Sequence, residues 1–135
     1  MSLDPIAAAS TREAVIAVLM LAMVSDRRVR PLEDEVLHAA LKRSRTLAGL
    51  SEKDLRALEA RVASALAETT LASAASRIPE DLRLPLFAQA IDILLADGEL
   101  TEAEADFVNG LIMHLNIDRN AVESIADVLA IKNRL

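Results

Sequence analysis

Hydrophobic and polar positions alternate with the period of an α-helix along almost the whole chain. Apolar residues recur every three or four positions in successive segments, which is the spacing of one helical face. A short first helix is predicted after Pro5, and the segment 67–78, which is rich in small residues, fits either a short helix or a linker. The main predicted helices cover residues 10–24, 31–45, 52–66, 85–96, 102–115 and 119–129.

Capping residues and prolines mark where these helices begin. A Ser, Thr or Asp just before an apolar repeat accepts hydrogen bonds from the free backbone N–H groups of the first turn. Proline suits the first helical position, so Pro85 predicts a helix start, preceded by a turn over 79–83. The predicted N-caps are Ser10, Ser51, Thr101 and Asp118.

The predicted helices differ in how much of their surface is apolar. The helix over 10–24 is apolar on almost every side, which is typical of a buried helix. The helix over 31–45 has one apolar stripe, with the more polar residues largely outside it. The stripe is Leu32, Val36, Leu37, Ala40 and Leu41, and the outside set is Glu33, Asp34, His38 and Lys42.

An internal repeat relates the two parts of the chain. A shift of 71 residues places Asp26 on Asp97 and Glu33 on Glu104. Beyond the second helix the shift falls to 67 residues, which places Gly49 on Asn116. Each half, about 11–66 and 83–130, therefore reads as helix, acidic turn, helix, short turn, helix. The repeat predicts two pseudo-symmetric halves whose apolar first helices meet in the middle.

Composition agrees with an all-α fold. The chain of 135 residues is 53% hydrophobic but only 1% aromatic, with three glycines, four prolines and no cysteine. Ala, Leu, Val and Ile with few helix breakers favour helices, and the length suits one domain. We expect a single all-α domain over 1–135 with about seven helices and no disulfide.

The net charge indicates which kinds of ligand the protein can bind. A formal charge of -6 with almost no aromatic side chains argues against nucleic acid as a ligand. The longest apolar run, from Ala14 to Val24, has eleven residues, whereas a bilayer-spanning helix needs roughly 20. No basic segment of a signal peptide precedes this run. These features predict a cytoplasmic protein whose ligands are cations or basic partners.

The stretch "LLADGELTEAEADF", residues 94–107, holds five carboxylates and no Lys or Arg. Thr101 and Glu104 have the spacing of a capping box, which explains most of the acids without a ligand. Asp97 instead lies near a helix C-terminus, where a carboxylate opposes the helix dipole by about 0.3–1 kcal/mol. A hard divalent cation, Ca²⁺ or Mg²⁺, bound by Asp97 and Glu104 would relieve that repulsion.

Comparison with an EF-hand loop limits this metal hypothesis. Asp97-Gly98 and Glu104 match the last fixed positions of the loop, but the first two positions fall on the apolar Ile93 and Leu95. Any ion would have few protein ligands and bind weakly. The first turn keeps Asp26 and Glu33 but inserts three arginines, Arg27, Arg28 and Arg30, which would repel a cation. The second turn is therefore the stronger candidate, and a purely structural turn remains open.

Catalytic chemistry finds little support in the sequence. His38 and His114 have no second His or Cys at ligand spacing, so each reads as a solvent-facing or core-edge histidine. Ser10, Ser51 and Thr101 lack a nearby His that could activate a hydroxyl nucleophile. We predict that the protein is not an enzyme.

Two helical halves with acidic turns, the second reading "ADGELTEAEADF" and followed by "LIMHLNID", resemble the tellurite-resistance TerB-like family. The resemblance covers about Thr11 to Leu129. It implies a compact all-α, non-enzymatic domain in tellurite resistance or stress response, which binds metal and associates with protein partners near the inner membrane. The residues that match the family's acidic positions are Asp97, Glu104, Asp26 and Glu33, although Arg27 replaces the glycine of the first turn.

A second hypothesis needs no ion. The alanine-rich region 57–75 would let another helix approach closely, so the chain would act as a plain interaction module that binds a protein partner or a second copy of itself.

Overall fold

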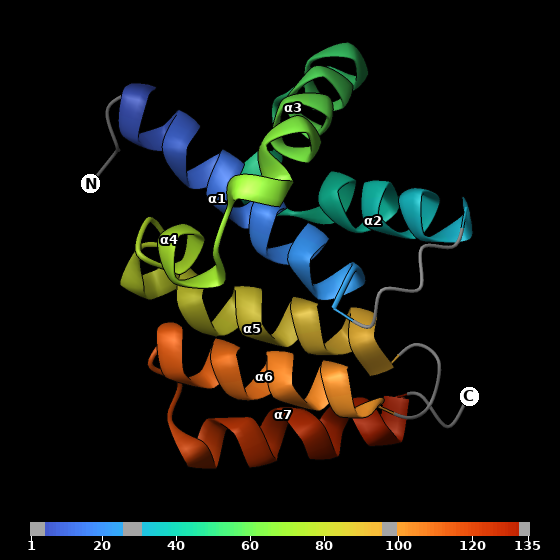
Figure 1. Cartoon of the computed structure of the whole chain (residues 1–135), viewed down its shortest axis with the longest axis vertical. Coiled ribbons are helices and arrows are strands. Elements are labelled where there is room, and N and C mark those ends of the chain that lie inside the picture. Colours follow the sequence, from blue (N-terminus) through green and yellow to red (C-terminus); the bar gives the residue numbers. More distant parts are fainter. Residues whose placement is uncertain (1–4, 26–30, 96–99, 133–135) are drawn as a thin grey trace.

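The computed structural model describes residues 5–25, 31–95 and 100–132 (Figure 1). Within these ranges the chain is helical and contains no strand, which confirms the all-α prediction. The helices are α1 (Pro5–Met23), α2 (Pro31–Arg43), η1 (Arg45–Leu47), α3 (Glu52–Ala65), η2 (Leu66–Glu68), α4 (Leu71–Ala75), α5 (Glu80–Leu94), α6 (Glu102–His114) and α7 (Arg119–Lys132).

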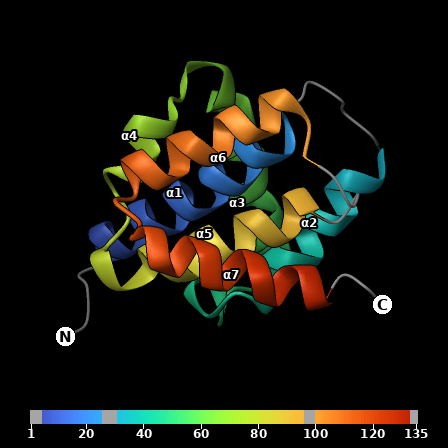
Figure 2. The same cartoon turned by 90° about the horizontal axis from the view of Figure 1, so that it is seen from below.

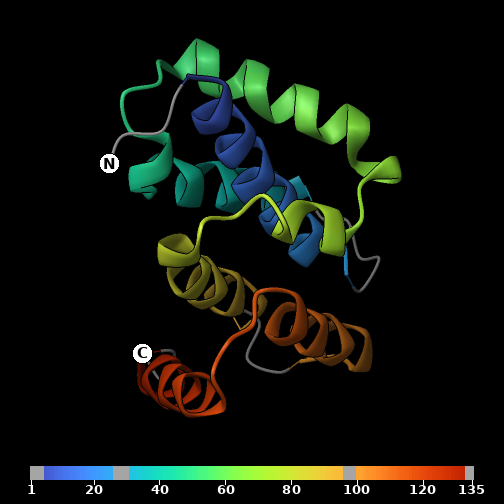
Figure 3. The same ribbon diagram turned by 90° about the vertical axis from the view of Figure 1, so that its left-hand side faces the viewer.

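Two helices, α1 and α5, form the centre of the molecule. α1 contacts α2, α3, α4 and α5, and its most extensive contact is with α5. Figures 1 and 3 show α3 at one end of the molecule and α7 at the other. α5 in turn contacts both α6 and α7. These two helices lie nearest the viewer when the molecule is seen from below (Figure 2). The predicted meeting of the two apolar first helices is confirmed, whereas the superposition of the two halves stays a prediction.

α1 is the most deeply buried helix, as its apolar composition predicts. Ala14, Ile16, Val18 and Leu19 have no exposed surface. The predicted start at Ser10 is wrong, because the helix already begins at Pro5 and continues through the capping-box segment. A proline at the first position opens the helix without losing a backbone bond. None of the described helices combines the length and hydropathy that crossing a bilayer requires.

The helix starts at Ser51 and Thr101 are confirmed by their hydrogen bonds. Ser51 Oγ accepts from the N–H of Asp54 at 3.0 Å. The two short turns that precede α3 and α7 each need a left-handed residue, namely Gly49 with φ +92° and Asn116 with φ +53°. These are the two residues that the repeat places on one another. The agreement supports the alignment at this position.

Around α5 the structure corrects the sequence-based boundaries. The helix begins at Glu80, directly after Pro79, so the predicted turn over 79–83 and start at Pro85 are wrong. Pro85 lies inside the helix with its ring exposed, and the helix loses only one internal backbone bond there. Burial of Leu86 and Phe87 against the core holds the helix through this position. Segment 67–78 contains η2 and α4, so its short-helix interpretation is the right one.

Candidate functional site

The start of α6 holds the acidic residues of the second turn. Thr101 Oγ1 accepts a hydrogen bond from the backbone N–H of Glu104 at 3.1 Å. In return, Glu104 Oε1 accepts from the backbone N–H of Thr101 at 2.9 Å. Both halves of the predicted capping box are present. The box fixes the Glu104 carboxylate at the positive end of the α6 dipole.

Glu104 differs from its acidic neighbours in burial. The residue is 7% exposed, whereas Glu102 and Asp106 are exposed to solvent. Within the described part of the chain, no Lys or Arg forms an ion pair with Glu104. The hydrogen bond to Oε1 and the helix dipole together offset the cost of removing this carboxylate from water. A carboxylate in this position keeps a second oxygen for a further ligand.

The other predicted metal ligands cannot be placed beside Glu104. Asp97 and Asp26 lie outside the described residues, as do Arg27, Arg28 and Arg30. Glu33 belongs to α2, but its side chain also falls outside the description. Among the residues that are described, no group of three or more His, Asp and Glu side chains is arranged to hold a metal ion. The four-residue assignment stays a prediction.

A buried histidine connects α2 with α3. His38 is 7% exposed, its Nδ1 lies 2.6 Å from Glu59 Oε1, and its Nε2 lies 2.6 Å from Glu52 Oε1. The core-edge interpretation of His38 is therefore correct, and its placement outside the buried stripe of its helix is wrong. A neutral imidazole carries one N–H, whereas an imidazolium donates to both carboxylates. His38 therefore joins both glutamates of α3 through its two ring nitrogens.

Two further cations complete this α2–α3 cluster, which comprises His38, Lys42, Glu52, Arg56 and Glu59. Lys42 Nζ lies 3.1 Å from Glu52 Oε2, and Arg56 lies within 4 Å of both carboxylates. The hydrogen bonds from Lys42 and then from His38 hold the pKa of the Glu52 carboxyl below its ordinary value of 4.5. The cluster is a compact network of alternating charge.

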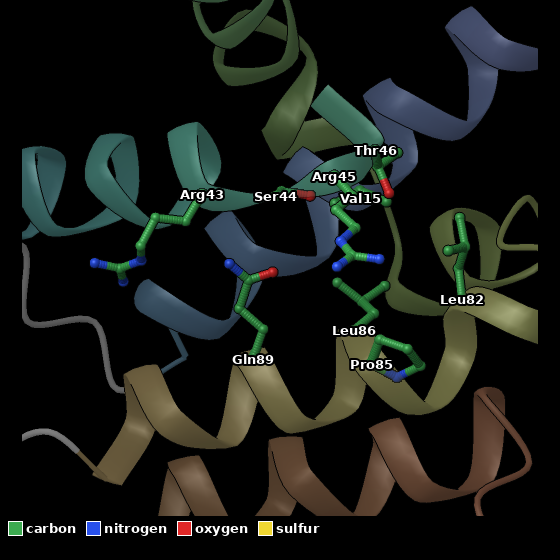
Figure 4. Close-up of a pocket in the computed structure, with 9 residues that line it drawn as sticks. All are labelled: Val15, Arg43, Ser44, Arg45, Thr46, Leu82, Pro85, Leu86 and Gln89. Carbon is green, nitrogen blue, oxygen red and sulfur yellow. The ribbon is translucent and has the colours of Figure 1, made fainter. Parts of the chain in front are cut away.

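A pocket of about 360 Å³ opens between α1, η1 and α5 (Figure 4). Val15 and Leu86 form its buried apolar wall, with Leu82 and Pro85 beside them. Arg43, Ser44, Arg45, Thr46 and Gln89 contribute the polar lining. Figure 4 shows Arg45 extending toward Leu86, while Arg43 points away. Among the described residues, no acidic residue and no histidine lines this pocket.

Comparison with known families covers nearly the whole chain. A model of the family described as tellurite resistance protein TerB matches residues 12–127. The chain belongs to the TerB family. No curated protein and no solved structure matches this TerB chain.

The TerB match spans both acidic turns, the α2–α3 cluster and the pocket. The acidic turns are the part of the candidate site that the sequence predicts, because their residues are close in the chain and their capping pattern is local. The cluster was missed, since Glu52 and Glu59 lie 14 and 21 residues beyond His38. One signal was present: Glu52, Arg56 and Glu59 follow one another at helical spacing on one face of α3.

Proposed function

We propose that this TerB domain serves tellurite resistance as a non-enzymatic module that binds a divalent cation weakly at the turn between α5 and α6. Ca²⁺ and Mg²⁺ are the ions whose preference for oxygen ligands fits such a turn. The observation that carries the proposal is the Glu104 carboxylate. It is buried and fixed by its capping box, with no ion pair among the described residues.

The position of Glu104 matches what a first-turn ligand requires. One carboxylate oxygen receives the Thr101 N–H, which fixes the orientation of the group before any ion arrives. The second oxygen would then coordinate the cation, and Asp97 and backbone carbonyls with water would supply further ligands. A fixed ligand loses little conformational entropy on binding. Because few charged protein ligands are present, we expect a dissociation constant near that of the weakest protein calcium sites, about 10⁻⁴–10⁻³ M.

The test is a titration of the whole chain with CaCl₂, MgCl₂ and ZnCl₂, followed by backbone amide shifts. Saturable shifts at Asp97, Gly98 and Glu104 are expected with Ca²⁺ or Mg²⁺. Glutamine preserves a capping box, so E104Q keeps the helix start while removing one ligand charge. D97N/E104Q should abolish the shifts, whereas E102Q, the same charge change on an exposed neighbour, should keep them. Unchanged amides at millimolar ion would refute cation binding.

An interaction module is the second candidate, favoured by exposed apolar residues of the last helix. Val128 and Ile131 lie three positions apart on α7 and are 64% and 62% exposed. Met113 of α6 is 68% exposed. If these side chains form one contiguous apolar patch, that patch would be the surface that another protein covers. The partner would be a second copy of the chain or another protein, including one attached to the inner membrane.

Size exclusion with light scattering of matched variants shows whether the α7 surface or the alanine-rich region 57–75 forms a dimer. If the chain dimerises through α7, V128K/I131K should yield monomers. A60K, on the exposed alanine face of α3, should then leave the dimer intact. The reverse pattern would favour the alanine-rich region that the sequence suggested. A strictly monomeric chain that captures no partner would count against the interaction module.

The composition of the pocket supports the proposed absence of catalysis. Ser44 and Thr46 bring hydroxyl groups to it, but no His, Asp or Glu of the described ranges lines it to act as a base. Binding alone is the chemistry that such a lining offers.

A further inference from the structure

The pocket between α1, η1 and α5 has the size and the divided lining of a small-molecule site. Its volume of about 360 Å³ lies at the lower end of the roughly 300–1,000 Å³ that such sites occupy. Val15 and Leu86, at 3% and 4% exposed, form a fixed apolar wall. Most of the polar lining comes from the adjacent segment 43–46, and Gln89 of α5 completes it. A ligand that fits both sides is amphipathic.

The polar side of the pocket is positively charged although the protein as a whole is acidic. Arg45 extends over the apolar wall in Figure 4, and Arg43 stands at the rim. Within the described ranges, neither arginine forms an ion pair. A third guanidinium, that of Arg12, lies close by and donates to the Thr46 carbonyl at 3.1 Å. An anionic group is therefore the complementary partner for this side.

The remaining contacts keep the pocket in shape. Gln89 Nε2 donates to the Ala40 carbonyl at 3.0 Å and so ties α5 to the end of α2. The bond from Arg12 to Thr46 ties η1 to α1 in the same way. Because these two bonds hold the elements that carry the lining residues, much of the site is formed before a ligand arrives. Such preorganisation reduces the entropy that binding loses.

We propose that this pocket binds a small aliphatic carboxylate, with its carboxylate on Arg45 and its apolar chain against Val15, Pro85 and Leu86. A single guanidinium directed over the wall matches the two oxygens and single charge of a carboxylate. A dianionic phosphate without an apolar body would leave the wall unused. This site is separate from the acidic turn, and its proposal does not depend on cation binding there.

The test uses sodium octanoate as the probe on the whole chain, with amide and methyl shifts as the readout. Octanoate should shift Val15, Leu86 and Gln89, while acetate and octylammonium at the same concentration should not. R45Q should weaken octanoate about tenfold, the effect of losing one charge-assisted hydrogen bond. R119Q, the same charge change at the start of α7, should leave the affinity unchanged.

A neutral probe distinguishes the loss of the Arg45 charge from a local change of the fold in R45Q. 1-Octanol should bind the parent and R45Q with equal affinity, because it uses only the apolar wall. Octanoate shifts located elsewhere would overturn the proposal. So would equal octanoate affinities of R45Q and R119Q, or octylammonium binding as well as octanoate does.

Discussion

The helices at the two ends of the molecule, α3 and α7, are attached to the rest of the protein by different chemistry. α3 buries Leu55 and Val62 and places two glutamates on the buried His38. α7 has no buried residue within its described length and rests on the half-buried Val122, Ile125 and Leu129. Its one ion pair within the described ranges joins Lys132 to Asp92 of α5 at 2.7 Å.

This difference shows what an internal repeat preserves and what it does not. The repeat places His38 on Asn109, Glu52 on Arg119 and Glu59 on Ala126. The apolar positions correspond, whereas every polar partner of the α2–α3 cluster is replaced. The two helices that the predicted repeat aligns are therefore attached differently: α3 buries apolar residues and a polar cluster, whereas α7 packs through half-buried apolar residues.

The largest expected effect comes from truncating one leucine in each end helix. L55A should destabilise the protein by about 2–5 kcal/mol, since Leu55 is 4% exposed and its removal leaves a cavity. L129A, at a half-buried site of α7, should cost about 1–2 kcal/mol because less apolar area is lost. Urea denaturation measures both. Equal losses would show that α7 is anchored as firmly as α3.

Removing the buried histidine tests the polar attachment. H38A removes the 2.6 Å contact to the Glu59 carboxylate, whose side chain is 12% exposed, and leaves it only the longer ion pair with Arg56 at 3.7 Å. We expect a loss of about 1–3 kcal/mol, the range for removing a hydrogen-bond partner from a buried polar group. H114A, at an exposed position of α6, should stay within about 0.5 kcal/mol of the parent. If both variants unfold at the same urea concentration, the cluster contributes nothing specific.

How much of this fold the sequence predicts depends on how local the deciding contacts are. The caps at Ser51 and Thr101 are correct because their donors lie three residues away. Pro85 misleads because a proline fits both a helix start and an exposed interior position, and only the packing of Leu86 and Phe87 decides between them.

For the candidate sites, too, local contacts can be predicted from the sequence and contacts between distant residues cannot. Glu104 can be predicted from the sequence because the capping residues and the acidic residues of its turn lie within one short segment. The sequence around His38 gives no sign of a special role. Its partners Glu52 and Glu59 belong to another helix, α3, and only the fold places them beside it. The pocket is harder still, because α1, η1 and α5 each contribute only part of its lining.

The two left-handed turn residues offer a smaller, matched test of the repeat. G49A should cost about 1–2 kcal/mol, since φ +92° strains any residue with a Cβ, although the space around Gly49 is open. Asn116 tolerates its φ of +53° better, and N116G should be neutral or stabilise by about 0.5 kcal/mol. Thermal unfolding measures both shifts. A neutral G49A would remove this turn from the correspondence between the halves.

The smallest effect concerns the exposed edge of the α2–α3 cluster and its dependence on pH. Because Lys42 and His38 lower the folded-state pKa of Glu52 below 4.5, its contribution to stability is present above that pH. The contribution is lost as the pH falls through the lowered value. The stability difference between the parent and E52Q should therefore be constant near neutral pH and shrink in acid.

Two controls, added salt and a matched substitution elsewhere, distinguish the contribution of Glu52 from general unfolding in acid. Glu52 is solvent-exposed, so added NaCl should reduce the difference between the parent and E52Q. E123Q makes the same charge change on α7, where no described ion pair involves Glu123, and should show no comparable acid-dependent loss. Urea midpoints across the acid range decide the matter. An E52Q difference that persists undiminished at the most acidic pH would assign its effect to packing, and α3 and α7 would then differ in apolar burial alone.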